Sequence, residues 1–502
     1  MKIYLFGNNC RYAAEQMLLT LFPGEHPEYP AGPPEGDRVE LSLFEGEKRD
    51  TAVCRLVRGG KAFFGRAAVS GTKLGSELAC TRETQRILSL SFYRAALASG
   101  VEKPVWGSLT GIRPGKLMSR FLEQGLSDRA SLAAFVRRYD VDRSRAELCL
   151  YTAHAALAAE KSLSPRDVCL YVGIPFCPTR CAYCSFVSIS VQKSMERIPE
   201  FLNALGREID ATAQTVKRLG LRPVALYIGG GTPTTLSEQQ LDALCGRLET
   251  AFDLTALREY SVEAGRPDTI TREKLEVLKK HGVTRVSVNP QTMDDRVLEA
   301  IGRKHTAQDV LTAFEAVRQT GGFSVNMDLI AGLPADTPAS FAKTLETVLA
   351  LAPENITVHT LARKKGSAIM RGEIPVPDAA AVGEMLAAAD TALFQNGYRP
   401  YYLYRQKYMS GGFENVGWQR GGAESLYNIC IMEELCSILA MGGGASTKLC
   451  TGGGRIERLF APKYPAEYID GIEKTVAAKE KIIQLLSPQF GVDMQEDRSN
   501  GI

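Results

Sequence analysis

A regular alternation of strand-like and helix-like segments between residues 167 and 364 constrains the fold of this chain most strongly. Six short stretches there are apolar and mostly β-branched: 168–174, 224–228, 259–262, 285–288, 324–330 and 356–361. The intervening segments carry apolar residues at helical spacing, as at Leu241, Leu244 and Leu248. Strands that alternate with helices form a parallel sheet through right-handed crossovers. The pattern therefore predicts an α/β fold, with six consecutive βα units in an incomplete barrel.

The regions on either side of this barrel have different patterns. Before it, period-2 alternation predicts a three-stranded meander, with Gly59-Gly60 as one hairpin turn and a long helix from 76 to 98. After it, the pattern is mostly helical. We therefore predict three domains: an N-terminal α+β domain over 1–166, the barrel over 167–364, and a mostly helical C-terminal region over 375–502.

The composition excludes several classes of protein. Of the 502 residues, 45% are hydrophobic and 23% are charged, as in ordinary soluble proteins. A net charge of +3 gives no basic field for nucleic acid or an anionic membrane. The sequence has no run of about 18 apolar residues, and we expect no signal peptide. Its 12 cysteines are too few for a secreted disulphide scaffold. We expect a cytoplasmic protein with no membrane or nucleic-acid partner.

Three cysteines follow the first of the six strands. Cys177, Cys181 and Cys184 have C-x3-C-x2-C spacing within the string Y-V-G-I-P-F-C-P-T-R-C-A-Y-C-S-F. A closed zinc site needs four ligands, whereas thiolates also bind iron–sulphur clusters. Three thiolates leave one iron of a four-iron cluster open, and S-adenosylmethionine could chelate it through its amino and carboxylate groups. Zinc-binding or simply buried cysteines are the alternative.

Other reactive or glycine-rich positions also follow strand ends. The loops after parallel strands meet at one rim, where barrels hold their active sites. The second strand is followed by Gly229-Gly230-Gly231-Thr232, where backbone without Cβ atoms could approach a ligand closely. The remaining four strand ends carry Glu263, Gln291, Asp328 and Ala362. We expect all of these on the same rim as the cysteines.

The string Y-x-x-I-P-F-C followed by C-x-Y-C resembles the signature of the radical S-adenosylmethionine superfamily, and within it the HemZ-like branch of the oxygen-independent coproporphyrinogen III oxidase/dehydrogenase family. The resemblance implies a 4Fe-4S cluster held by Cys177, Cys181 and Cys184, with Tyr171 as a further catalytic residue. It also implies contacts to S-adenosylmethionine from Tyr171, Tyr183, Gly230, Gly231, Thr232, Glu263, Gln291, Arg303, Asp328 and Ala362.

Several of these residues have ordinary structural alternatives. Glu263 could be a solvated acid, Arg303 a surface cation, and each tyrosine a core residue. His359 could point into the barrel. The tract 401–408 combines rings with cations, which suits a tetrapyrrole with propionates but is also typical of a packed surface strand. The segment 104–114 is either a packed linker loop or a surface that closes over the neighbouring domain.

The resemblance implies a radical oxidoreductase of haem and porphyrin biosynthesis. An external donor such as flavodoxin or ferredoxin would reduce the cluster, and cleavage of S-adenosylmethionine would give a radical that abstracts hydrogen from a propionate. Loss of carbon dioxide and one electron would leave a vinyl group, converting coproporphyrinogen III to protoporphyrinogen IX. The C-terminal region would lie on the substrate side.

The chain departs from the oxidase pattern at two positions. Gly173 stands where that pattern has His, and Phe186 where it has a further Cys. Two other functions therefore stay open: a haem-binding or haem-delivery protein on the same scaffold, and a radical enzyme acting on another substrate such as RNA. The near-neutral charge counts against RNA.

Overall fold

The computed structural model of the chain describes residues 1–70, 77–184, 189–190, 195–362, 369, 375–406, 409–452 and 454–491. Phe186 and the last two residues of the tract 401–408 lie outside the described residues. The chain forms two compact units. The first contains Met1–Leu150 together with Arg405 and Gln406, and the second begins at Tyr151.

The first unit is built on a four-stranded sheet with strand order β1-β2-β3-β4. Its elements are β1 (Lys2–Phe6), α1 (Arg11–Leu21), β2 (Arg38–Phe44), β3 (Arg49–Arg58), β4 (Lys61–Ser70), α2 (Glu77–Ala98), α3 (Gly115–Glu123), α4 (Asp128–Tyr139) and the start of α5 (Arg143–Lys161). The predicted meander is confirmed as β2, β3 and β4, which pair antiparallel. Gly59 and Gly60 form the turn at positive φ, where glycine is favoured. Apolar side chains of α1 and α2 pack with those of the sheet.

The segment 104–114 is packed inside the first unit. Trp106 is fully buried, and the guanidinium of Arg405 lies 4.9 Å from the centre of its ring. Arg405 also donates a hydrogen bond of 2.6 Å to the carbonyl of Leu109. These contacts agree with the packed-loop interpretation of this segment.

The second unit is built on an open, mixed sheet of 11 strands. Their order is β13-β14-β12-β11-β10-β9-β8-β5-β15-β16-β17. The strands are β5 (Asp167–Ile174), β8 (Arg222–Gly230), β9 (Glu259–Gly265), β10 (Arg285–Val288), β11 (Ser324–Ala331), β12 (Asn355–Thr360), β13 (Arg399–Tyr404), β14 (Asn415–Gln419), β15 (Ser437–Gly442), β16 (Ser446–Cys450) and β17 (Ile456–Phe460). All six predicted strands are confirmed, and consecutive ones pair parallel. Antiparallel pairs lie at both edges, so the barrel is not closed.

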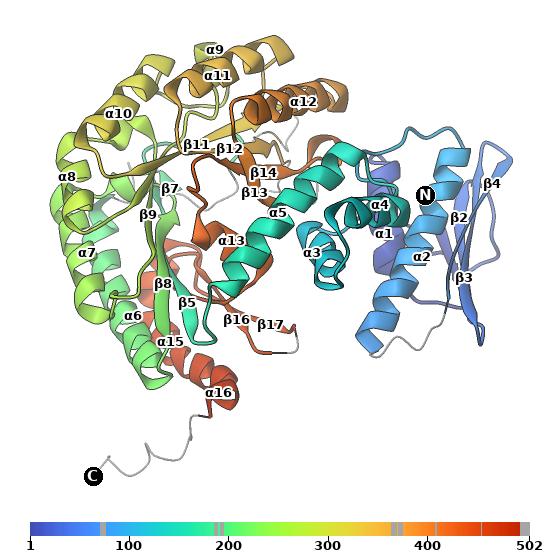
Figure 1. Cartoon of the computed structure of the whole chain (residues 1–502), viewed down its shortest axis with the longest axis horizontal. Helices are drawn as coiled ribbons and strands as arrows, with labels where there is room; N and C mark the ends of the chain where they lie inside the picture. Colours follow the sequence, from blue (N-terminus) through green and yellow to red (C-terminus); the bar gives the residue numbers. More distant parts are fainter. Residues whose placement is uncertain are drawn as a thin grey trace. The chain divides into compact units, whose positions relative to one another are not determined.

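Helices alternate with and follow the strands of this unit. They are α6 (Ile198–Arg218), α7 (Glu238–Ala251), α8 (Arg272–Lys280), α9 (Asp295–Ala300), α10 (Ala307–Thr320), α11 (Pro338–Leu351), α12 (Ala379–Gln395), α13 (Leu426–Glu433), α14 (Pro465–Asp470), α15 (Ile472–Ala477) and α16 (Lys479–Phe490). Figure 1 shows α6, α7, α8, α10 and α11, coloured from green to orange, following one another around the outer face of the sheet. The predicted capping boxes at Ser237 and Thr306 are present at the starts of α7 and α10. In the described part of the chain, no helix combines the length and apolar character needed to cross a bilayer.

The C-terminal region supplies five strands besides its helices. β15 extends the parallel sheet beside β5, with Ser437 opposite Val168 and Gly442 opposite Gly173. Every residue of β15 is buried. A strand buried on both faces is continuously apolar, and periodicity alone cannot distinguish such a run from a buried helix. For this reason the sequence pattern predicted a mostly helical region and not this strand.

A buried ion pair joins α6 to the C-terminal helices. The carboxylate of Glu208 lies 2.6 Å from the ammonium of Lys479, and both side chains are buried. The same carboxylate accepts hydrogen bonds from the Tyr468 hydroxyl and, at 2.8 Å, from the backbone N–H of Gly442. Lys479 also donates to the carbonyl of Ala440. This network fixes the end of β15 against the helices around it.

Candidate active site

The three cysteines of the predicted cluster lie on a loop that is hydrogen-bonded to the neighbouring strand ends. Cys177 ends the short strand β6 (Phe176–Cys177), which pairs with β7 (Ile189–Ser190). Cys181 is buried and Cys184 is partly exposed. Cys184 N–H donates to the Cys181 carbonyl at 3.1 Å, and Ala182 N–H donates to the Ile301 carbonyl at 3.0 Å. None of the three forms a disulphide bond. They are therefore available together as soft metal ligands.

The glycine run after β8 packs directly against this loop. Gly231 N–H donates to the Ile174 carbonyl, and Thr232 N–H donates to the Phe176 carbonyl, each at 2.7 Å. The Thr232 hydroxyl lies 3.5 Å from the Cys177 sulphur. A Cβ atom at Gly231 would lie only 2.4 Å from the Phe176 carbonyl oxygen. Gly231 thus permits the close approach of the chain's own backbone, and its predicted contact with a ligand stays a prediction.

Arg266 is a residue of this site that the sequence pattern did not reveal. It follows β9, is buried, and donates to the Thr179 hydroxyl at 2.8 Å. The same nitrogen, Nη1, lies 3.9 Å from the Cys181 sulphur, and the other two guanidinium nitrogens, Nε and Nη2, donate to the carboxylate of Asp268 at 3.0 Å each. Donors to a ligand sulphur tune the electronic properties of the metal centre that it holds. The position just after a strand end was the only sequence signal for this residue.

Arg303 is buried beside the same loop, so the surface-cation alternative is wrong. Its guanidinium donates to the Asn289 carbonyl at 2.7 Å and to the Tyr183 hydroxyl at 3.2 Å. Its Nε has no hydrogen-bond partner among the described residues. A buried donor that is left over in this way suits an anion such as a carboxylate.

Glu263 lies at the end of β9, deep in the rim. Its carboxylate accepts a hydrogen bond of 2.6 Å from the Tyr227 hydroxyl. Burial raises the pKa of Glu263 from 4.5 to about 7; the hydrogen bond from Tyr227 opposes this shift, and the charge of Asp328 adds to it. A Cβ atom at Gly229 would lie 2.9 Å from Glu263 Oε2, so glycine makes room for the carboxylate.

The raised pKa of Glu263 predicts a pH-dependent contribution to stability. The folded chain keeps a proton that the unfolded chain releases above pH 4.5, so the contribution is complete below that pH and is lost as the pH rises through about 7. Glu263→Gln cannot titrate. We expect urea unfolding midpoints of the wild type to fall relative to those of Glu263→Gln between these pH values. Parallel midpoint curves for the two proteins would contradict this assignment.

Polar side chains of the fifth and sixth parallel strands, β11 and β12, also contribute to the site. Asp328 accepts a hydrogen bond of 2.8 Å from Asn326, and His359 Nε2 lies 3.7 Å from its other oxygen. Burial alone would raise the pKa of Asp328, but His359 and Asn326 lower it below its usual value. His359 thus faces the site.

Gln291 is buried at a φ of 68°, a strained value for a residue other than glycine. Ala362, after β12, pairs with Met409.

Three tyrosine rings stack on one another, and one of them belongs to Tyr227, the partner of Glu263. The ring centre of Tyr171 lies 6.2 Å from those of Tyr227 and Tyr427, which are 4.4 Å from each other. Burial raises the pKa of Tyr171, so its hydroxyl stays protonated. Tyr427, on α13, was not predicted, because nothing in the sequence connects it to strands so distant along the chain.

The donor set of the rim is chemically coherent. It offers three soft thiols, an unpaired guanidinium N–H beside them, and a carboxylate that titrates near neutral pH. Soft thiols suit an iron–sulphur cluster, and the two charged groups suit the carboxylate and the ammonium or hydroxyl groups of an amino-acid or nucleoside ligand. The residues present therefore fit the cofactors that the sequence predicts.

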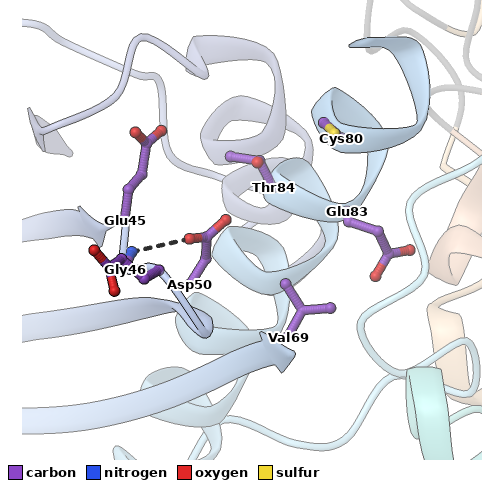
Figure 2. Close-up of a pocket in the computed structure, with 8 residues that line it drawn as sticks. Glu45, Gly46, Asp50, Val69, Cys80, Glu83 and Thr84 are labelled. Carbon is purple, nitrogen blue, oxygen red and sulfur yellow. Dashed lines mark hydrogen bonds between the residues drawn. The ribbon is translucent and has the colours of Figure 1, made fainter. Parts of the chain in front are cut away.

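A hollow in the first unit is unrelated to this rim. Its volume is about 420 Å³, and its lining residues are Glu45, Gly46, Glu47, Asp50, Val69, Cys80, Glu83 and Thr84. Figure 2 shows the hydrogen bond that Gly46 N–H donates to the Asp50 carboxylate among these residues. Glu83 is already paired with Arg86. None of the predicted site residues lines this hollow.

Comparisons with known proteins identify relatives of this chain. The sequence model of the family described as "Radical SAM superfamily" matches residues 171–348. The "Oxygen-independent coproporphyrinogen-III oxidase-like protein HemZ" of Bacillus subtilis (strain 168) is 39% identical over 385 residues, which cover 76% of this chain and 77% of that protein. The "Heme chaperone HemW" of the same organism is 33% identical over 264 residues, covering 52% of this chain and 65% of that protein.

A solved structure has a similar fold. It is described as "Coproporphyrinogen III oxidase (HemN) from Escherichia coli is a Radical SAM enzyme". The TM-score is 0.51 at 23% identity, over 68% of this chain and 82% of that one. At this identity the likeness concerns the fold alone.

Proposed function

Because this chain belongs to the radical S-adenosylmethionine superfamily, in the HemZ-like branch of the oxygen-independent coproporphyrinogen III oxidase family, we propose that it oxidatively decarboxylates coproporphyrinogen III to protoporphyrinogen IX. The protein is then a cytoplasmic oxidoreductase of porphyrin biosynthesis, which receives electrons from a donor such as flavodoxin or ferredoxin. Its C-terminal region contributes the substrate side.

The superfamily uses a 4Fe-4S cluster and S-adenosylmethionine, which together supply a radical able to abstract hydrogen from an unactivated carbon. In our proposal Cys177, Cys181 and Cys184 hold the cluster. Arg303, through its free Nε, binds the carboxylate of S-adenosylmethionine, and Glu263 accepts hydrogen bonds from its ammonium or ribose groups. The remaining predicted residues of the rim orient the nucleoside and keep water away from it.

The observation that carries the proposal is the composition of the rim itself. Thiols, a free guanidinium N–H and the carboxylates of Glu263 and Asp328 meet at the ends of parallel strands. Of these groups, Arg303 Nε is buried without a partner among the described residues, which is unfavourable unless a ligand binds there. A protein that only carried haem would not need the geometry that positions S-adenosylmethionine for cleavage.

A second candidate, a haem-binding or haem-delivery protein, is supported by Gly173 and by the similarity to the heme chaperone HemW. A Cβ atom at Gly173 would lie 3.0 Å from the Gly443 carbonyl oxygen and 3.3 Å from the ring of Tyr171. The C-terminal turn thus fills the space into which the histidine of the oxidase pattern would extend. At this position the chain therefore has a packing contact in place of a histidine side chain that could take part in substrate chemistry.

One anaerobic assay separates the two candidates. Reconstituted protein is incubated with a reductant, S-adenosylmethionine and coproporphyrinogen III, and the products are analysed by mass spectrometry. We expect methionine and 5′-deoxyadenosine in proportion to the vinyl groups formed, with a tripropionate intermediate appearing first. Stoichiometric haem binding without decarboxylated product would instead establish the carrier. Cleavage of S-adenosylmethionine without porphyrin product would indicate another radical substrate.

A further inference from the structure

Three further thiols converge inside the second unit, away from the catalytic rim. Cys169 lies on β5, Cys430 on α13, and Cys436 just before β15. Their sulphur atoms all lie within 4.8 Å of one another, and those of Cys169 and Cys436 are 3.7 Å apart. All three are free and buried, with Cys436 the most exposed at 8%. These residues, the second thiol cluster, come from three separate elements and meet at one point.

The second thiol cluster is distinct from the cysteines of the rim. Cys169 is near the beginning of β5, whereas the rim cysteines follow its end. Ile174 comes five residue steps after Cys169 along the extended strand, a distance of about 16 Å. The two sets of thiols therefore lie at opposite ends of the same strand and cannot share a metal centre.

The sulphur separations fit a single ion. A metal–sulphur bond of about 2.3 Å places two thiolates on one tetrahedral or trigonal ion about 3.8 to 4.0 Å apart. The observed separations require only small side-chain movements to reach this geometry. Thiolates that each bind a different iron of a cubane lie further apart, so the spacing disfavours a second iron–sulphur cluster.

We propose that Cys169, Cys430 and Cys436 form a three-thiolate site for one soft d10 metal ion, Cu+ or Zn2+. Soft thiolates select these ions among the common metals. No fourth histidine, cysteine or carboxylate joins the group among the described residues. Cu+ is satisfied by three thiolates, whereas Zn2+ needs a fourth ligand such as a water, and Cys436 is the most exposed of the three residues. The site stands independently of the proposed porphyrin chemistry.

The surroundings explain what the ion does for the fold. The second thiol cluster lies in an apolar core with Tyr427, Leu426 and Ile438. The nearby carboxylate of Glu259 is already occupied by the hydroxyl of Ser425 and the N–H of Leu426, and does not compete for the metal. An ion bound here joins β5, which leads into the catalytic loop, to α13 and β15. Metal binding to the folded chain alone stabilises it by mass action.

The test uses full-length protein in which Cys177, Cys181 and Cys184 are all serine, so that the iron–sulphur site cannot bind metal. The protein is fully reduced under anaerobic conditions and titrated separately with Zn2+ and with Cu+ against a competing chelator. We expect one equivalent of at least one ion to bind, with three sulphur ligands by X-ray absorption. Binding should raise the thermal midpoint.

Two variants made in this background locate the site. Cys430→Ala should lose stoichiometric binding and the thermal shift. If Cys430→Ala does not fold, Cys436→Ser, at the more exposed position, should show the same two losses. Cys245→Ala is the matched control, because Cys245 is equally buried on α7 but lies outside the cluster; it should bind like its parent. Absence of tight binding in the parent, binding that survives both variants, or recovery of these thiols as a disulphide from the native protein would overturn the proposal.

Discussion

Replacement of Cys177, Cys181 or Cys184 with serine should abolish the iron–sulphur cluster. The three thiols lie on one loop that is fixed to the ends of β5 and β8, and each provides one ligand in our assignment. Each single variant should lose the brown chromophore, the EPR signal of the reduced state and all cleavage of S-adenosylmethionine. Cys245→Ser, which changes a buried thiol on α7, should keep all three signals. Full iron and sulphide content in the triple variant would show that other residues hold the cluster.

Glu208→Ala should lower the free energy of unfolding of the second unit by about 3–5 kcal/mol, because it leaves the buried ammonium of Lys479 without its partner. It also leaves the Tyr468 hydroxyl and the Gly442 N–H without an acceptor. The measurement is the shift of the denaturant midpoint, multiplied by the slope of the transition.

The neighbouring residue on the same helix provides the control for Glu208. Arg207 pairs with Glu473 at 2.5 Å, but both side chains are largely exposed. Arg207→Ala should therefore cost at most about 1 kcal/mol. Equal shifts for Glu208→Ala and Arg207→Ala would mean that the buried network contributes no more than a surface ion pair.

The sequence was sufficient to predict the six parallel strands, because each apolar run is separated from the next by a helix with recognisable start signals. Ser237 and Thr306 illustrate this, because their capping boxes depend only on residues three positions apart. β15 was not predictable in the same way. Its apolar run has no period, and its pairing with β5 depends on contacts between residues far apart in the chain.

The residues of the rim show the same division between those predictable from local pattern and those that depend on long-range contacts. The cysteines were predicted from their local spacing, and Glu263 and Asp328 because each lies in the C-terminal half of a recognisable strand. Arg266 and Tyr427 could not be found, because their roles depend on which side chains of other elements they meet. Gly231 was found for a different reason from the one that the structure gives, since a pattern of glycines does not tell whether ligand or backbone comes close.

The position of β15 also sets an order of events during synthesis of the chain. Ser437, the partner of Val168 in this pairing, comes 269 positions later in the chain (437 minus 168). At about 5–20 residues per second, a ribosome needs roughly 15 to 50 seconds to make the chain between them. Throughout that time one edge of β5 lacks its final neighbour, and unpaired strand edges readily associate with other chains. β5, which leads into the cysteine loop, is thus the last of the six predicted strands to gain both of its neighbours, and one of its edges stays unpaired until residue 442 has emerged.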